Sequence, residues 1–214
     1  MRSNPRTSGQ SDADLTITEA ARRAQILRHA IDVVADHGYA GASLNRIAEH
    51  AGISKGLISY HFAGKADLLK AIVQDVFERG AGFLHERAPV PEPATAGSAL
   101  RSYLEGHLAF IGSHAREVGA VVEVVRNLRD AEGRLVYNNA WDAESYGELM
   151  RIFQAGQASG EFREFDPRVM AIAVRRVIDG FTFQVMGFPD LDVAAFTAEV
   201  VTLFDHATTP KERS

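Results

Sequence analysis

The sequence predicts an all-α protein of about nine helices, and three observations support this. Apolar residues recur every three or four positions through most of the chain, which is the spacing of one helix face. Glycine, proline and capping residues separate these stretches at intervals typical of helices. No segment shows the two-residue alternation that predicts a strand, and no internal repeat is present. We therefore expect helices to supply the whole core.

The first helix is expected to follow a polar tail. Residues 1–15 are rich in serine, asparagine, arginine and aspartate, and we expect them to form a flexible tail. Thr16 and Glu19 have the spacing of a capping box, which predicts a helix start there. Apolar residues within 26–34 form one helix face. Gly38 is placed to end the helix, because helices often end in a left-handed residue.

Two short helices joined by a glycine turn are expected next. Ser43 suits the N-cap of the first, and Gly52 breaks that helix. Ser54 suits the N-cap of the second, and Ile53 and Ile58 have the spacing of a hydrophobic staple. Together with the longer helix before them, these elements form a helix-turn-helix pattern. Its second helix presents a polar face, as a reader of the DNA major groove does.

Six further helices are expected in the remaining chain. The first runs from about residue 65 to the proline-rich connector at 88–93, which cannot continue a helix. Gly160 is expected to end the fourth, and Asp166 followed by Pro167 predicts the start of the fifth. The last five are expected at about 98–113, 117–129, 134–158, 166–186 and 192–206.

Composition excludes several classes of protein. The chain has 214 residues, 46% of them apolar, which is enough to bury a core. Cysteine is absent, which excludes disulfides, thiolate nucleophiles and cysteine-ligated zinc. No apolar run reaches the ~18 residues of a membrane span. The first seventeen residues lack the apolar centre of an export signal, so we expect a cytoplasmic protein without a membrane partner.

Charge is distributed unevenly along the chain. The whole chain carries a formal charge of −5, whereas residues 1–65 hold eight Arg and Lys against six Asp and Glu. Residues 1–65, the front of the chain, are therefore mildly basic, and the rest of the chain is acidic. This asymmetry weakly favours a nucleic-acid site at the front, although ordinary surface variation produces similar splits.

The helix-turn-helix region carries a specific resemblance. Residues 42–69, ASLNRIAEHAGISKGLISYHFAGKADLL, resemble the tetracycline-repressor (TetR) family of transcription regulators. The residues that carry it are Gly38, Ser43, Ile47, Ala48, Ala51, Gly52, Ser54, Lys55, Gly56, Phe62, Lys65, Leu68 and Leu69. The close resemblance covers residues 20–75, about a quarter of the chain. The remainder matches in helix number and order, and in the IDGF stretch at 178–181.

The resemblance implies a homodimeric regulator that binds a palindromic operator in double-stranded DNA and is released by a small organic effector, most often a repressor. It implies a tail at 1–15, a helix-turn-helix DNA-binding domain at 16–64, a helical ligand-binding and dimerisation domain at 65–208, and a tail at 209–214. No cofactor and no metal site are expected. The effector is left open between a hydrophobic metabolite, an acyl compound and an aromatic molecule.

The resemblance also implies which residues contact DNA. They are Ser43, Ser54, Lys55, Gly56, Leu57, Ser59, Tyr60, His61 and Lys65. Hydroxyl and ammonium groups among them can donate to phosphates, and Gly56 lets the backbone approach closely. Leu57 either meets a thymine methyl group or packs in the core, and the serines can cap helices as well as bind phosphate. The sequence departs from the family at Ser59, often aromatic, and at Leu57, often polar.

Arg2 and Arg6 in the tail have two interpretations. Basic arms can enter a minor groove, but two arginines in such a stretch are more often part of a plain disordered tail.

The resemblance further implies an effector pocket and a dimer interface in the C-terminal domain. Pocket candidates are Tyr103, His107, Phe110, Glu123, Arg126, Trp141, Tyr146, Phe153 and Phe181. Glu123 would favour a cationic effector and Arg126 an anionic one, and each candidate can equally be an ordinary packing residue. Interface candidates on the last two helices are Val174, Val177, Ile178, Phe181, Val185, Phe196, Val200 and Leu203.

The sequence disfavours two other classes of function. An enzyme is disfavoured, because no G-x-S-x-G motif, phosphate-binding loop or dinucleotide fingerprint is present. His107 and His114 also lack the i, i+4 spacing of helical metal ligands. The alternative is a helical small-molecule-binding protein without operator function. The intact turn and the two lysines, Lys55 and Lys65, argue against it.

Overall fold

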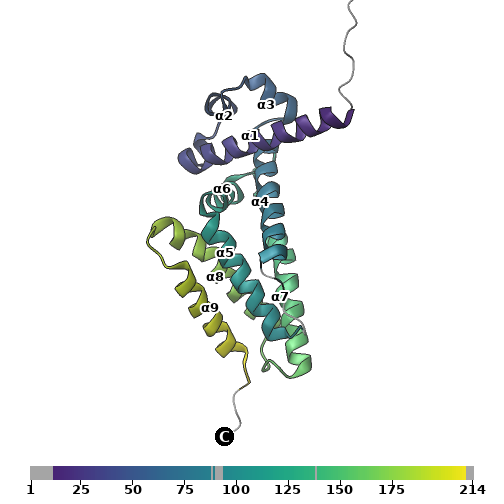
Figure 1. Cartoon of the computed structure of the whole chain (residues 1–214), viewed down its shortest axis with the longest axis vertical. Helices are drawn as coiled ribbons and strands as arrows, with labels where there is room; N and C mark the ends of the chain where they lie inside the picture. Colours follow the sequence, from purple (N-terminus) through teal and green to yellow (C-terminus); the bar gives the residue numbers. More distant parts are fainter. Residues whose placement is uncertain (1–11, 88, 90–93, 138, 211–214) are drawn as a thin grey trace, which may run out of the picture.

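The structure is a computed structural model that describes residues 12–87, 89, 94–137 and 139–210, and these residues form nine helices (Figure 1). Side chains are described from residue 18 onward, except those of 88, 90–93, 138–145 and 211–214. The helices are α1 (Asp12–Gly41), α2 (Leu44–Ala51), α3 (Lys55–His61), α4 (Lys65–Arg87), α5 (Ala96–Ser113), α6 (Ala115–Asn127), α7 (Asn139–Ser159), α8 (Pro167–Gly187) and α9 (Val193–Thr208). The predicted all-α class is confirmed.

Helices α1, α2 and α3 gather at one end of the molecule, which we call the head (Figure 1). α1 lies across this end, and α4 runs from it into the larger part, the body, which α5, α7, α8 and α9 complete. α6 lies directly beneath α1 and packs along it. The head therefore rests on α4 and α6.

Local signals set several helix ends as the sequence predicts. Three predicted N-caps accept backbone hydrogen bonds: Ser43 Oγ from Arg46 N at 3.2 Å, Ser54 Oγ from Leu57 N at 3.2 Å, and Asp166 Oδ1 from Arg168 N at 2.8 Å. Such caps satisfy amides that have no partner within the helix. Gly38 interrupts α1 with φ 66°, a conformation in which a side chain is strained.

Two clusters of buried apolar side chains form the core. One joins α1, α2 and α3 to α4 and α6, and it includes Ile58 of α3 and Val124 of α6. The other joins α5, α7, α8 and α9 around Phe153 and Phe181. The first cluster crosses residue 64, so the head shares its core with the start of the body.

Two predicted helix boundaries were wrong. α7 begins at Asn139 instead of 134, because Arg129 pairs with Leu135 across a tight turn. The Asp130 carboxylate holds this turn by accepting from Arg134 N at 2.8 Å and Glu132 N at 3.0 Å. α1 begins at Asp12, four residues before the predicted start, while the side chain of Thr16 lies outside the described residues.

Candidate nucleic-acid interface

Helix α3 is short and is anchored from beneath. Ile58 is fully buried and Phe62, the residue that follows the helix, is 2% exposed, so both fix the helix to the core. Arg23 of α1 adds a second anchor from outside. Its Nη1 donates to the carbonyl oxygen of His61 at 2.9 Å, and its guanidinium lies 4.2 Å from the centre of the Phe62 ring. Sequence reasoning missed Arg23, because 38 residues separate it from His61.

The outward face of α3 holds most of the predicted DNA contacts. Lys55, Gly56, Ser59 and Tyr60 are exposed, and the side chain of Tyr60 is 72% exposed. Ser43 and Ser54 are also exposed while capping their helices, whereas Leu57, His61 and Lys65 are half-buried. The structure therefore gathers a lysine, hydroxyl groups and a bare glycine backbone on one accessible surface. Arg2 and Arg6 lie outside the described residues.

Tyr60 has an acidic neighbour on α1. Its hydroxyl donates to Glu19 Oε1 at 3.1 Å. This contact raises the pKa of Tyr60, because loss of the proton would break the hydrogen bond and place a phenolate beside the carboxylate. The ring also lies edge-on to His61, with ring centres 5.0 Å apart. A phosphate approaching Tyr60 would therefore meet a carboxylate as well as a hydroxyl group.

Lys65 is turned toward the protein. Its Nζ donates to the carbonyl oxygen of Tyr39 at 2.7 Å and lies 4.5 Å from the centre of the Tyr39 ring. Partial burial lowers the pKa of Lys65, because a desolvated ammonium is less stable than a solvated one. This contact joins the start of α4 to the end of α1.

The pocket candidates whose side chains are described lie in several different places. A cavity of about 550 Å³ lies between α4, α5 and α7, and Tyr103 is the only predicted residue among its described lining. Phe153 and Phe181 are fully buried in the body core. Trp141 lies outside the residues whose side chains are described. The described lining is Leu84, His85, Pro89, Ala99, Ser102, Tyr103, Glu148, Arg151 and Ile152.

The remaining candidates make specific contacts elsewhere. Glu123 accepts from Tyr39 N at 3.3 Å, next to the break at Gly38, so it ties α6 to the end of α1. Arg126 lies over the Phe183 ring, 4.7 Å from its centre. The hydroxyl of Tyr146 accepts from Arg176 at 2.7 Å.

Three of the pocket candidates, Tyr103, His107 and Phe110, take part in contacts between aromatic and imidazole rings. His107 stacks near Tyr103, with ring centres 4.0 Å apart, and its Nδ1 lies 2.7 Å from the Tyr103 carbonyl oxygen. Since a carbonyl only accepts, Nδ1 carries the proton. Burial lowers the pKa of His107 to about 4, with the nearby Arg175 acting in the same direction. Phe110 stacks on His114 near α4 instead of facing the cavity.

The interface candidates divide between core and surface. Val174, Ile178, Phe181 and Val200 are buried within the chain's own core, Val177, Val185 and Phe196 are half-buried, and Leu203 is 57% exposed. The buried four therefore pack in the core of the single chain. Sequence reasoning missed the exposed apolar residues of α8, which are Val169, Ile172, Phe183 and Met186. Among the described residues, no helix is long and apolar enough to cross a membrane.

Comparisons with known proteins identify the head. Residues 26–72 match the family described as "Bacterial regulatory proteins, tetR family". The HTH-type transcriptional repressor AcnR of Corynebacterium efficiens is 37% identical over 163 residues, 74% of this chain and 79% of the relative. The fatty acid metabolism regulator protein of Bacillus subtilis is 28% identical over 189 residues, 84% of this chain and 91% of the relative. By contrast, the match to BetI 2 of Chromohalobacter salexigens, 30% identical, spans 42% of this chain and only 43% of that relative.

Solved structures extend the likeness to the body. FadR from Bacillus subtilis, in complex with stearoyl-CoA, is similar with a TM-score of 0.68 and 24% identity, covering 84% of this chain and 96% of that chain. AibR, in complex with isovaleryl coenzyme A and operator DNA, has a TM-score of 0.71 and 21% identity, covering 85% and 97%. The chain therefore belongs to the TetR family of bacterial regulatory proteins, and it is a DNA-binding transcriptional regulator and not an enzyme.

Proposed function

We propose that this chain is a cytoplasmic, homodimeric repressor that binds a palindromic operator through two copies of α3 and leaves it when an acyl-CoA enters the body. Residues 16–64 form the reading domain and residues 65–208 the effector and dimer domain. The observation that carries this proposal is the exposed polar surface of α3, which is held rigidly from below by Ile58 and from the side by Arg23.

The operator contacts follow from what is exposed on the head. Lys55 is placed to meet a phosphate, and Gly56 leaves the backbone open beside it. Ser59 and Tyr60, on the exposed face, are the residues best placed to reach base edges or the backbone of a major groove. Lys65 acts indirectly, since its ammonium holds the Tyr39 carbonyl and so fixes α4 against α1.

The cavity between α4, α5 and α7 is the proposed effector site. Its volume of about 550 Å³ is within the range of small-molecule pockets. Leu84, Tyr103 and Ile152 supply apolar walls for an acyl chain, whereas exposed His85 and Arg151 supply cationic groups for the phosphates of coenzyme A. The complexes of FadR with stearoyl-CoA and of AibR with isovaleryl coenzyme A support this class of effector.

The dimer is proposed to form through α8 and α9. Val169, Ile172, Phe183 and Met186 of α8 and Leu203 of α9 are large apolar side chains exposed in the single chain. Exposed apolar residues concentrated on two helices are typical of an interface between subunits.

Effector binding is proposed to reach the head through α6. Arg116 of α6 pairs with Asp36 of α1 at 2.7 Å, and Glu123 of α6 accepts from Tyr39 N at the end of α1. α6 also packs against α4 and α8. A ligand that binds better to a form with α6 displaced would favour a wrong separation of the two heads, because both must fit adjacent major grooves.

The proposal is tested with the purified full-length protein. We expect selection from random duplexes to yield a palindrome, and stearoyl-CoA or isovaleryl-CoA, but not free coenzyme A, to abolish the resulting gel shift. If acyl-CoA binds but no duplex is selected, the chain is instead a ligand-binding protein without operator function. If DNA binding survives every acyl-CoA tested, the effector class is wrong.

A further inference from the structure

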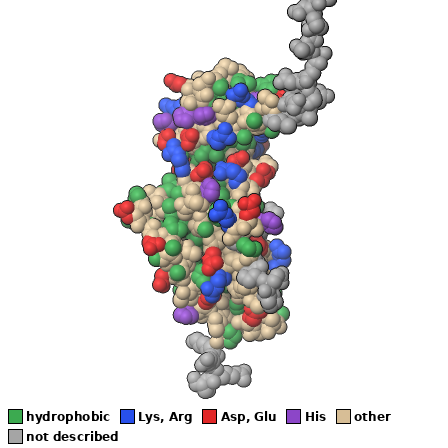
Figure 2. Space-filling model, viewed as in Figure 1, with side chains coloured by type: hydrophobic (Ala, Val, Ile, Leu, Met, Phe, Trp, Pro, Cys, Tyr) green, Lys and Arg blue, Asp and Glu red, His purple; other side chains and the backbone are tan. Residues whose placement is uncertain are grey.

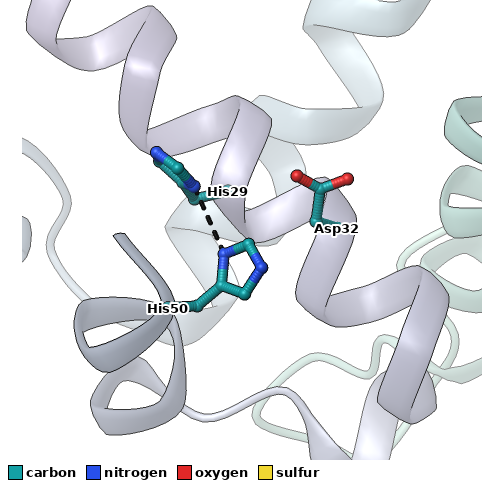
Figure 3. Close-up of side chains that lie close together, drawn as sticks. All are labelled: His29, Asp32 and His50. Carbon is teal, nitrogen blue, oxygen red and sulfur yellow. Dashed lines mark hydrogen bonds between the residues drawn. The ribbon is translucent and has the colours of Figure 1, made fainter. Parts of the chain in front are cut away.

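Two histidines and an aspartate meet at the contact between α1 and α2 (Figure 3). His29 and Asp32 come from α1 and His50 from α2. Nδ1 of His29 and Nδ1 of His50 are 3.2 Å apart, and the two rings lie edge-on, with an angle of 68° between their planes. One ring nitrogen of each histidine and one carboxylate oxygen of Asp32 all lie within 4.8 Å of one another. None of the three is among the residues proposed to contact the operator.

The spacing of the two nitrogens fits a metal ion. Ligands of tetrahedral zinc, bound at about 2.0–2.1 Å, lie about 3.3–3.4 Å apart, close to the spacing of His29 and His50. Asp32 has to approach by at most about 1.4 Å to match the same geometry, which rotation of its side chain can supply. Two imidazoles and one carboxylate form a ligand set that zinc uses when it keeps its fourth position for water.

Without a metal ion, the two facing nitrogens are restricted. One Nδ1 must donate a hydrogen bond and the other must accept it, so only one pairing of tautomers fits the contact. A metal ion instead accepts lone pairs from both rings. The site is also acidic: Asp36 lies one turn beyond Asp32 on α1 and interacts electrostatically with His50. These carboxylates favour a cation between the two helices.

The ion pair at Asp32 does not prevent such binding. Arg116 of α6 donates from Nε to Asp32 Oδ1 at 3.2 Å, so it competes for the same carboxylate. The same guanidinium contacts Asp36 at 2.7 Å and therefore stays paired when Asp32 turns toward a metal ion. His50 is exposed and His29 and Asp32 are half-buried, so an ion can reach the cluster from solvent. Figure 2 shows histidine side chains on the surface of the head beside acidic and basic ones.

We propose that His29, Asp32 and His50 bind one divalent transition-metal ion per chain, with zinc as the preferred probe. The ion ties α2 to α1 and so stabilises the support on which α3 rests. Sequence spacing could not indicate this grouping, because His29 and His50 are 21 residues apart on different helices. Since the chain has no cysteine, histidine and carboxylate are its only strong zinc ligands.

The test is a zinc titration of full-length protein without a histidine tag, in competition with a chromophoric chelator. We expect one zinc ion per chain for the wild type and for the control His206→Gln, an exposed histidine of α9. His50→Gln should weaken binding by at least about tenfold, since loss of even an outer-shell partner has an effect of that size. Zinc should also raise the Tm of the wild type and not that of His50→Gln.

Two results would overturn the proposal: no stoichiometric binding by the wild type at micromolar zinc, or binding that is unchanged in His50→Gln. X-ray absorption at the zinc edge of the wild type provides a readout that does not depend on a variant folding. Two imidazole ligands with oxygen would support the site, whereas oxygen ligands alone or three or more imidazoles would refute it.

Discussion

Lys55 and Lys65 carry the same charge near the two ends of α3, but their side chains differ in exposure and in contacts. Lys55 begins α3 and is exposed, whereas the ammonium of Lys65 is held 2.7 Å from the carbonyl oxygen of Tyr39. Replacing each with alanine should therefore have different effects on operator binding. Only Lys55→Ala should remove a contact with DNA phosphate.

The size of the effect follows from counterion release. Each phosphate neutralised on duplex DNA adds about 0.9 to the steepness with which log affinity falls with log salt. A dimer presents Lys55 twice, so Lys55→Ala should flatten the slope by about 1.8. Between 50 and 200 mM salt, the wild type should then lose about 12-fold more affinity than this variant. Lys65→Ala should keep the slope and lose about 1 kcal/mol of folding stability, the value of one hydrogen bond.

Fluorescence anisotropy with a labelled operator, repeated across this salt range, measures the slopes, and urea unfolding measures stability. An unchanged slope in Lys55→Ala would refute the assignment of that lysine. A slope flattened equally in Lys65→Ala would show that its ammonium leaves Tyr39 in the complex, so that the geometry of the free protein is a poor guide to contacts.

Three further predictions concern packing, pH and assembly. Gly156→Ala should cost roughly 2 kcal/mol in urea unfolding, because its Cβ would lie 2.1 Å from the ring of Phe162, whereas Gly147→Ala in the same helix meets nothing and should stabilise by about 0.5–1 kcal/mol. The pKa of His107 is lowered to about 4 in the folded protein, so on acidification the unfolded chain binds this proton at a higher pH than the folded chain does. The free energy of unfolding should therefore fall by roughly 3 kcal/mol between pH 6.5 and pH 4. His107→Gln should lack this component, and a wild type with the same pH dependence as the variant would contradict the buried, neutral imidazole. Leu203→Glu should weaken self-association in analytical ultracentrifugation by more than about tenfold, since it buries a charge in the proposed interface, and an unchanged dimer would place the interface elsewhere.

Features that depend on neighbouring residues could be predicted from the sequence. The caps at Ser43, Ser54 and Asp166 depend on residues two or three positions away, and the break at Gly38 depends on one backbone conformation. Periodicity of apolar residues likewise indicated which stretches are helical. All these signals depend on residues within one or two helical turns, and at these positions tertiary contacts did not change the resulting local structure.

The partner of each apolar face could not be predicted in the same way. Periodicity shows that α8 and α9 have wide apolar faces, but it does not separate the part that meets the chain's own core from the part left exposed. Ile178 and Phe181 therefore proved to be core residues, while Phe183 and Met186 of the same helix are exposed. The predicted start of α7 was wrong for a related reason. The Asp130 side chain accepts hydrogen bonds from the backbone of a turn, and this turn forms in place of the first residues of the predicted helix.

The polar contacts that join the head to the body follow no local rule at all. Glu123 is 84 residues from Tyr39, and Arg116 is 84 residues from Asp32. Glu123 was a candidate for binding an effector directly, yet its carboxylate accepts from the Tyr39 amide, beside the break in α1 at Gly38. A charged residue in the body can thus influence effector response without touching the effector, because it sets where the head sits. Glu123→Gln keeps a side-chain oxygen that can accept from Tyr39, whereas Glu123→Ala leaves that amide without this partner. If α6 couples effector to operator, Glu123→Ala should weaken the operator complex while acyl-CoA affinity in the absence of DNA changes much less, and equal losses of both would argue that α6 shapes the cavity instead.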